Sequence, residues 1–173
     1  IIVNGELVFS GATGQINLEK KTTATTKSVY RIASMSKSFT ATAVGLAVTE
    51  GYFSIDDPVV SFFPEETPVD ASDLLAGMRV RHLLTMGTGQ AVDTWSVMVD
   101  RPDGNWIKGF FSVPVLHTPG THFVYNTGAT YILSAIVQKT TGMKLADYLQ
   151  PRLFAPLGIE GASWQESPQG ITA

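Results

Sequence analysis

A single lysine, Lys37, stands in a stretch of chain that carries no other charge from Ile32 to Thr49. Most residues after the lysine are small or apolar, which favours a helix buried nearly all round. A charged group on such a helix requires a partner or a shifted pKa. The stretch therefore predicts a core helix that begins at Ser34 and stops at Gly51, with a reactive or paired cation in its first turn.

Ser34 and Lys37 are three residues apart, so on a helix they lie on one face about one turn from each other. A serine hydroxyl is a poor nucleophile until a nearby base removes its proton, and a desolvated lysine can act as that base. The free N–H groups of the helix start would favour an oxyanion beside the serine. The spacing alone is weak evidence, because a surface lysine beside a capping serine gives the same pattern.

Composition limits the function classes. The 173 residues are 44% hydrophobic and 16% charged, with a net charge of −3 and no cysteine. These values indicate a globular chain without a disulfide framework, a thiolate site or a basic nucleic-acid surface. No apolar run is long enough for a membrane span, and we expect neither a cofactor nor a metal. The compartment stays open between bacterial periplasm or exterior and cytoplasm.

Segment patterns predict an α+β fold in one incomplete domain, residues 1–173. Residues 1–9 read as a β-hairpin around Asn4-Gly5, and residues 1–27 form the hairpin part of a sheet. Residues 28–173 read as mainly helical, with short helices near 78–86 and 106–111 and a long one ended by Gly142. The irregular stretch 87–122 is typical of a binding or active-site wall.

Tyr125 lies in a segment that follows the Pro119-Gly120 turn and leads into the long helix. A tyrosine at such a junction can place its hydroxyl in a cleft, and beside a lysine ammonium it could act as a general base. The alternative is an aromatic core side chain with an exposed hydroxyl.

Together these segments resemble a known family. Residues 34–41 (SMSKSFTA) and 125–127 (YNT), with 50–59, 79–89 and 154–159, are similar to penicillin-recognising serine hydrolases. These comprise class C-type β-lactamases, DD-peptidases and related esterases. The blocks follow the family's order across essentially the whole chain. The resemblance implies a β-lactamase/transpeptidase-like fold and a small-molecule substrate: a β-lactam, a D-alanyl peptide or a small ester.

The resemblance also implies roles for individual residues. Ser34 would be the nucleophile, Lys37 the activating base and Tyr125 the proton carrier, with Asn126 and Thr127 contacting substrate. The family often has Asn two positions after the tyrosine, where this chain has Thr127. A hydroxyl cannot replace both functions of a carboxamide, which favours an esterase or peptidase over a proficient β-lactamase.

The family's third motif, Lys-Thr-Gly or a relative, has no match. Lys139-Thr140-Thr141-Gly142 is one residue too long and falls at a helix end. We therefore expect a fragment whose C-terminal sheet strands are missing and whose partner is the remainder of its own polypeptide. Its first hairpin would then leave an open edge.

Two other interpretations remain. His82, His117 and His122 could suggest a metal site, but no further ligand stands at useful spacing and His82 is better explained as a structural histidine. A non-catalytic relative or β-lactam sensor would bind or acylate without turnover. The joint presence of Ser34, Lys37 and Tyr125 favours an enzyme.

Overall fold

The computed structural model describes residues 1–173, which form two compact units, residues 1–34 and residues 35–173. Each unit is described by itself. The architecture is mixed: the first unit contains small antiparallel sheets, and the second is helical. The boundary that the sequence suggested, residue 27, falls inside the first unit.

The first unit consists of two short hairpins. Strands β1 (Ile2–Val3) and β2 (Glu6–Leu7) pair antiparallel. The predicted turn is confirmed: Asn4 and Gly5 have φ of 50° and 84°, the left-handed values that a two-residue hairpin turn needs. Strands β3 (Gln15–Asn17) and β4 (Thr22–Thr23) form a second hairpin, which the polar composition of this stretch concealed.

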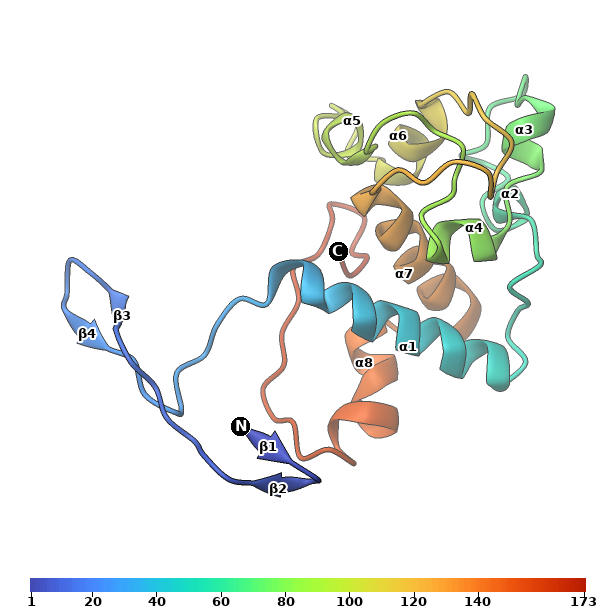
Figure 1. The fold of residues 1–173 in the computed structure, drawn as a ribbon. Coiled ribbons are helices and arrows are strands. Elements are labelled where there is room, and N and C mark those ends of the chain that lie inside the picture. The colour runs from blue at the N-terminus through green and yellow to red at the C-terminus, as the bar shows by residue number, and fades with distance from the viewer. The chain divides into compact units, whose positions relative to one another are not determined.

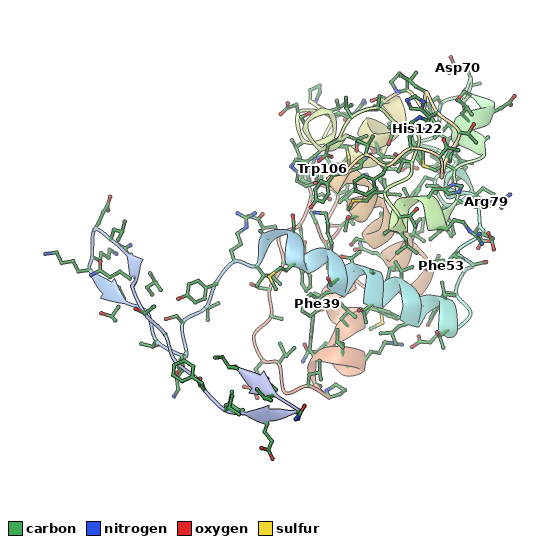
Figure 2. All side chains as sticks on the ribbon, viewed as in Figure 1. Phe39, Phe53, Asp70, Arg79, Trp106 and His122 are labelled. Carbon is green, nitrogen blue, oxygen red and sulfur yellow. The ribbon has the colours of Figure 1, made fainter.

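The hairpin unit has almost no core. Ala24 is its only buried residue, while Ile2 is 70% exposed. Figure 2 shows the side chains of these strands standing out from the backbone. Backbone hydrogen bonds therefore hold the hairpins, and burial of apolar side chains contributes little.

Three helices form the centre of the second unit: α1 (Ser36–Thr49), α7 (Thr127–Thr141) and α8 (Leu145–Leu149). Helix α1 packs against both α7 and α8 (Figure 1). Gly142 ends α7 with φ of 72°, as predicted, because a left-handed C-terminal residue is easiest for glycine. A π-helical turn, η2 (Gln150–Phe154), continues from α8.

The predicted nucleophile helix differs from the observed one in two respects. A 3₁₀ turn, η1 (Ala33–Met35), precedes α1, so the α-helix begins at Ser36 instead of Ser34. Burial all round is also wrong, because only Thr40, Ala43, Val44 and Ala47 of α1 are buried. Its other face carries small residues, which lose little free energy in water, so lack of charge does not require burial.

Five short helices complete the unit. They are α2 (Val59–Phe62), α3 (Asp73–Ala76), α4 (Val80–Leu84), α5 (Trp95–Val99) and α6 (Trp106–Ser112). Helix α6 buries Ile107, Phe110 and Phe111, which confirms the apolar face predicted there. Residues 86–94 and 115–126 lie in connections between helices that contain turns and bends.

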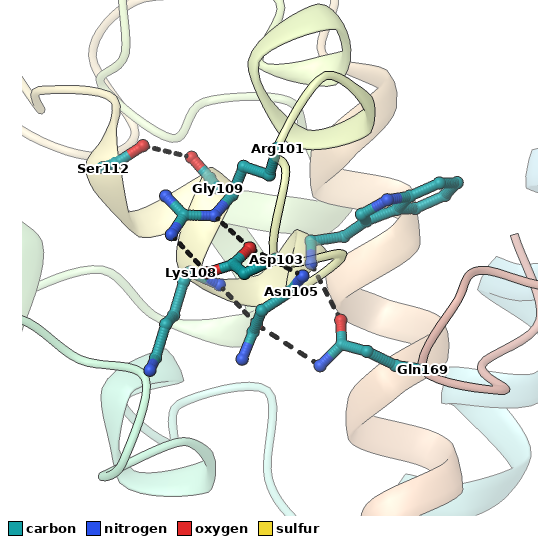
Figure 3. Close-up of polar contacts among 8 residues, drawn as sticks. Arg101, Asp103, Asn105, Lys108, Gly109, Ser112 and Gln169 are labelled. Carbon is teal, nitrogen blue, oxygen red and sulfur yellow. Dashed lines mark hydrogen bonds and ion pairs between the residues drawn. The ribbon is translucent and has the colours of Figure 1, made fainter.

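A polar cluster joins the start of α6 to the C-terminal segment (Figure 3). The Asn105 side chain caps α6 by accepting from Lys108 N, and Arg101 pairs with Asp103 through two hydrogen bonds. Gln169 accepts from Trp106 N at 2.8 Å and donates to Asn105 Oδ1 at 3.3 Å. Residues near the end of the chain therefore help to fix α6. None of the helices is both long and apolar enough to cross a membrane.

Candidate active site

The structure brings Lys37 and Tyr125 together within the helical unit. Lys37 lies in the first turn of α1, and its Nζ stands 5.0 Å from the centroid of the Tyr125 ring. Tyr125 is 46% exposed, and Lys37 is half-buried. An ammonium over an aromatic face is attracted by the ring quadrupole, by about 0.5–1 kcal/mol at an exposed site. Two predicted site residues that are distant in sequence are therefore neighbours at the surface of the helical unit.

Ser34 is exposed and lies in the middle of η1. The residue before it, Ala33, has φ of 47°. A left-handed conformation is unfavourable for a residue with a Cβ, by about 1–2 kcal/mol, and such strain concentrates at functional sites. The pairing of Ser34 with Lys37 stays a prediction.

The Tyr125 segment is held by an adjacent loop. We call residues 86–94 the inner loop and residues 115–126 the tyrosine segment. Val124 N donates to Met86 O at 3.1 Å, and Gly120 N donates to Gly87 O at 2.7 Å. The carbonyl of Gly89 accepts from both Leu116 N and His117 N. These backbone bonds fix the tyrosine segment along much of its length.

Gly89 explains how the two loops approach so closely. Its φ is +83°, and a Cβ at this position would lie 2.2 Å from His117 O. No side chain fits at that distance, so glycine is required here for both its conformation and its small size. The glycine-rich run that the sequence predicted as part of an active-site wall thus has a defined structural reason.

Asn126 is fully buried, and its side chain bonds to other parts of the protein. Its Oδ1 caps α7 by accepting from Ala129 N, and it also accepts from Thr94 Oγ1 at 2.8 Å and Thr94 N at 3.3 Å. Its Nδ2 donates to Gln90 Oε1 at 3.0 Å. The carboxamide therefore links the start of α7 to the inner loop.

Thr127, the first residue of α7, is half-buried. Its backbone N–H donates to Asp93 Oδ1 at 2.9 Å, and the same oxygen accepts from Trp95 N at 3.0 Å. The Thr127 side chain takes no part in these bonds. The contact of Asn126 or Thr127 with substrate stays a prediction.

The structure also shows the surroundings of other residues to which the sequence drew attention. His82 Nδ1 accepts from Arg79 N at 3.1 Å, and burial, with Arg81 and Arg79 nearby, lowers the pKa of His82. Lys139 lies in the last turn of α7, with its Nζ 5.3 Å from the Phe63 ring centroid. The rings of His117 and His122 stack with centroids 3.8 Å apart.

A family model described as Beta-lactamase matches residues 1–172, which is nearly the whole chain. The chain belongs to the Beta-lactamase family. This confirms the resemblance that the Ser34 and Tyr125 segments indicated. The mixed fold, with its helical region and small antiparallel sheets, is that of β-lactamases and penicillin-binding proteins.

Similar proteins span several activities within this family. Esterase EstB of Burkholderia gladioli is 28% identical over 173 residues, covering 90% of this chain and 43% of the esterase. D-aminopeptidase of Brucella anthropi is 28% identical over 167 residues, covering 94% of this chain and 31% of the enzyme. The octameric penicillin-binding protein homologue from Pyrococcus abyssi superposes with a TM-score of 0.75 at 26% identity, over 94% of this chain and 39% of that protein. The chain spans less than half the length of each.

Sequence reasoning missed Gln90, Asp93 and Thr94, which hold the start of α7. The signal available was weak: a glutamine, an aspartate and a threonine in an apolar, glycine-rich loop. A buried polar residue is informative once its burial is known. Only the fold brings the inner loop beside Asn126, so spacing along the chain could not reveal this network.

Proposed function

We propose that this chain carries the acyl-transfer centre of a serine hydrolase. The observation that supports this most directly is the position of Lys37 Nζ, 5.0 Å from the Tyr125 ring centroid, because the two residues come from the two segments that resemble the family's motifs. Membership of a family whose named relatives include esterases and D-aminopeptidases supports the same reaction class. The substrate is proposed to be a β-lactam, a D-alanyl peptide or a small ester.

In this proposal, Ser34 Oγ attacks the substrate carbonyl carbon while Lys37, as the amine, takes up the hydroxyl proton. The negative charge develops on the carbonyl oxygen, near the N–H groups at the start of the α1 helical segment. Collapse of this intermediate breaks the bond to the leaving group, which receives a proton through Tyr125. Water then attacks the acyl-serine, returns a proton along the same groups and releases the acid.

The backbone at Ala33 agrees with a nucleophile at Ser34. A non-glycine residue at φ of 47° carries some strain, and such values occur at reactive sites as well as in turns, as at Asn4 and Lys21 of this chain. The turn η1 exposes Ser34 directly before the helix. An ordinary capping serine needs neither the strained turn nor a lysine three residues later.

Intact-mass measurement after incubation with a small activated ester, and separately with a penicillin, tests the proposal. We expect one acyl adduct that disappears in Ser34→Ala and persists in Ser38→Ala, a matched control that removes an exposed hydroxyl in the first turn of α1. Lys37→Met and Tyr125→Phe should each slow labelling about 10²–10⁴-fold. A folded wild-type chain that neither forms an adduct nor hydrolyses either reagent, or an adduct that persists in Ser34→Ala, would contradict the proposal.

The same experiment separates the alternative function, a sensor. A sensor forms a lasting adduct with penicillin and shows no turnover, whereas a hydrolase loses the acyl group and recovers its original mass. Preference for the activated ester over penicillin would support the esterase assignment, one of the two that Thr127 favours. Release of D-alanine from a D-alanyl peptide would support the peptidase assignment.

A further inference from the structure

Three buried polar side chains are linked to one another at Asn126, the residue that follows Tyr125. Gln90, Thr94 and Asn126 each have no exposed surface, and we call these three residues the amide clasp. Asn126 bonds to both partners, through Nδ2 to Gln90 Oε1 and through Oδ1 to the backbone and hydroxyl of Thr94. All three belong to the helical unit.

Gln90 extends the clasp to a third segment. Its Nε2 donates to Phe110 O at 2.9 Å and to Val113 O at 3.3 Å, at the end of α6. One glutamine therefore joins the inner loop, the α6 end and the residue next to Tyr125. Because buried polar groups are costly when unpaired, this network fixes its members in one arrangement.

The clasp is closely packed against the first turn of α7. A Cβ at Gly128, in the first turn of α7, would lie 2.0 Å from Thr94 Oγ1 and 2.4 Å from Met98 Sδ. The chain on both sides of Tyr125 is also held, by the bond from Val124 N to Met86 O and by that from Thr127 N to Asp93 Oδ1.

We propose that the amide clasp is a positioning device, in which Gln90 and Thr94 act through Asn126 to hold Tyr125 against Lys37. Apolar residues of similar volume would fill this space with comparable stability, so stability alone does not require three buried polar side chains. Hydrogen bonds have preferred directions, so the clasp fixes Asn126, the residue next to the tyrosine, at one position along the inner loop. The catalytic meaning of this role rests on the proposed function of Tyr125.

This inference gives Asn126 a role different from the substrate contact that the sequence suggested. A side chain with no exposed surface cannot meet a ligand without leaving its position. Its Oδ1 already accepts three hydrogen bonds. Asn126 is therefore a positioning residue, and Thr127, half-buried at the same helix start, is the one of the pair left to contact substrate.

The first test measures geometry and needs no activity. In chain labelled with ¹³C at tyrosine rings, Lys37→Met should shift the Tyr125 resonance, which Tyr125→Phe identifies. We expect this shift to vanish, or to fall at least about twofold, in a Gln90→Met or Thr94→Val background. Thr94→Val is the milder change, because the shape is kept and only the hydroxyl is lost, with its bond to Asn126 Oδ1 and its longer contact to Met98 Sδ. An unchanged Lys37 effect in a folded Thr94→Val chain overturns the proposal.

The second test measures the rate of Ser34 acylation by the activated ester at several ester concentrations. Displacement of a proton carrier by about 1 Å can slow a reaction about 100-fold. We expect Gln90→Met to lower the maximal rate by this order, while the ester concentration for half-maximal rate stays within about twofold. Equal changes in both quantities, or no change in the rate, would overturn the positioning role.

Ser134→Ala is the matched control for both tests. It also removes a buried hydrogen bond, from Ser134 Oγ to Thr172 O at 2.7 Å, but on another part of α7. We expect it to lower stability and leave the Tyr125 shift and the maximal rate unchanged; a similar loss in Ser134→Ala would refute the proposal. If wild-type chain is folded but never acylated, the proposed function fails, and the resonance test still decides whether the clasp holds Tyr125.

Discussion

The two units of this chain are stabilised in different ways. In residues 1–34, hairpins are closed by backbone hydrogen bonds, and apolar side chains such as Ile2 remain exposed. In residues 35–173, helices bury a continuous core in which Ile132, Ile136 and Leu145 have no exposed surface. A two-stranded hairpin is marginally stable in water without a packed face, whereas a helical core of this kind is stable.

This contrast explains where the candidate site gains its rigidity. Lys37 and Tyr125 both belong to the helical unit, on or beside α1 and α7. Ser34 is the last residue of the hairpin unit and lies in a turn instead of the core. Lys37 and Tyr125 therefore belong to the unit with the buried core, and Ser34 belongs to the unit that lacks one.

The largest expected effect comes from truncating the same residue type in each unit. Ile136→Ala should lower the free energy of unfolding by about 3–4 kcal/mol, because it opens a cavity at a fully buried position. Ile2→Ala, at a side chain that is 70% exposed, should change it by less than about 0.5 kcal/mol. Urea denaturation followed by far-UV circular dichroism measures both, and equal losses would remove the distinction between the units.

Two glycines in the helical unit give the next test. Gly128→Ala should destabilise it by about 2–3 kcal/mol, because the new methyl group would overlap Thr94 Oγ1 and Met98 Sδ. Gly45→Ala is the matched control: it lies within α1, with no atom within 4 Å of the added Cβ. Alanine is the better helix former there, so we expect a gain of about 0.5–1 kcal/mol.

Thermal denaturation of both variants tests whether stability falls in Gly128→Ala and rises in Gly45→Ala. A loss of stability in Gly45→Ala would mean that other atoms pack against the face of α1 that is exposed in the structure. Full stability in Gly128→Ala would mean that the clasp region can yield, which would also weaken its proposed positioning role.

How much the sequence could predict depends on the range of the interactions. Local signals were sufficient for the Asn4-Gly5 turn, the end of α7 at Gly142 and the apolar face of α6. The family resemblance identified the β-lactamase-like fold. Absence of charge was misleading in α1, because small residues tolerate both core and solvent.

The same distinction between local and long-range interactions applies to the candidate site. Lys37 and Tyr125 could be proposed from motifs, and their proximity required the fold. The clasp could not be predicted, because its bonds join residues such as Gln90 and Asn126 across more than thirty positions and are invisible to helical or strand periodicity. The buried state of Asn126 likewise depends on tertiary packing alone.

A smaller effect is expected at the junction of the units. Ala33 has φ of 47°, and a β-branched side chain is poorly tolerated in this conformation. Ala33→Val should lower the free energy of unfolding by about 1–2 kcal/mol and slow the labelling of Ser34. Ala33→Gly should change the free energy of unfolding by less than about 0.5 kcal/mol, because relief of strain in the folded chain offsets the added freedom of the unfolded chain. Thermal denaturation measures the change in stability of each variant, and labelling followed by mass measurement gives the rate at Ser34. If Ala33→Val labelled as fast as wild type, the turn would not constrain the serine.

The smallest expected effect is a difference between the two units in how acid changes their stability. Arg152 Nε donates to Glu50 Oε1 at 2.7 Å and Tyr148 donates to Glu50 Oε2 at 3.0 Å, and the bond from Arg152 is the main reason that the pKa of Glu50 is lowered from 4.5. A carboxyl with a lowered folded-state pKa stabilises the fold above its unfolded-state value, and this contribution is lost as pH falls through the folded-state value.

Below about pH 4.5, wild type should therefore lose stability more steeply than Glu50→Gln, whose amide does not titrate. Hydrogen exchange, corrected for intrinsic rates, gives the location: α8 amides should lose protection on acidification in wild type and less so in Glu50→Gln. The β1–β2 amides should show the same low protection in both chains, because burial does not stabilise that hairpin. Equal acid sensitivity of the two chains would mean that the Glu50–Arg152 pair, at the surface of the core, contributes nothing to the stability that distinguishes the helical unit.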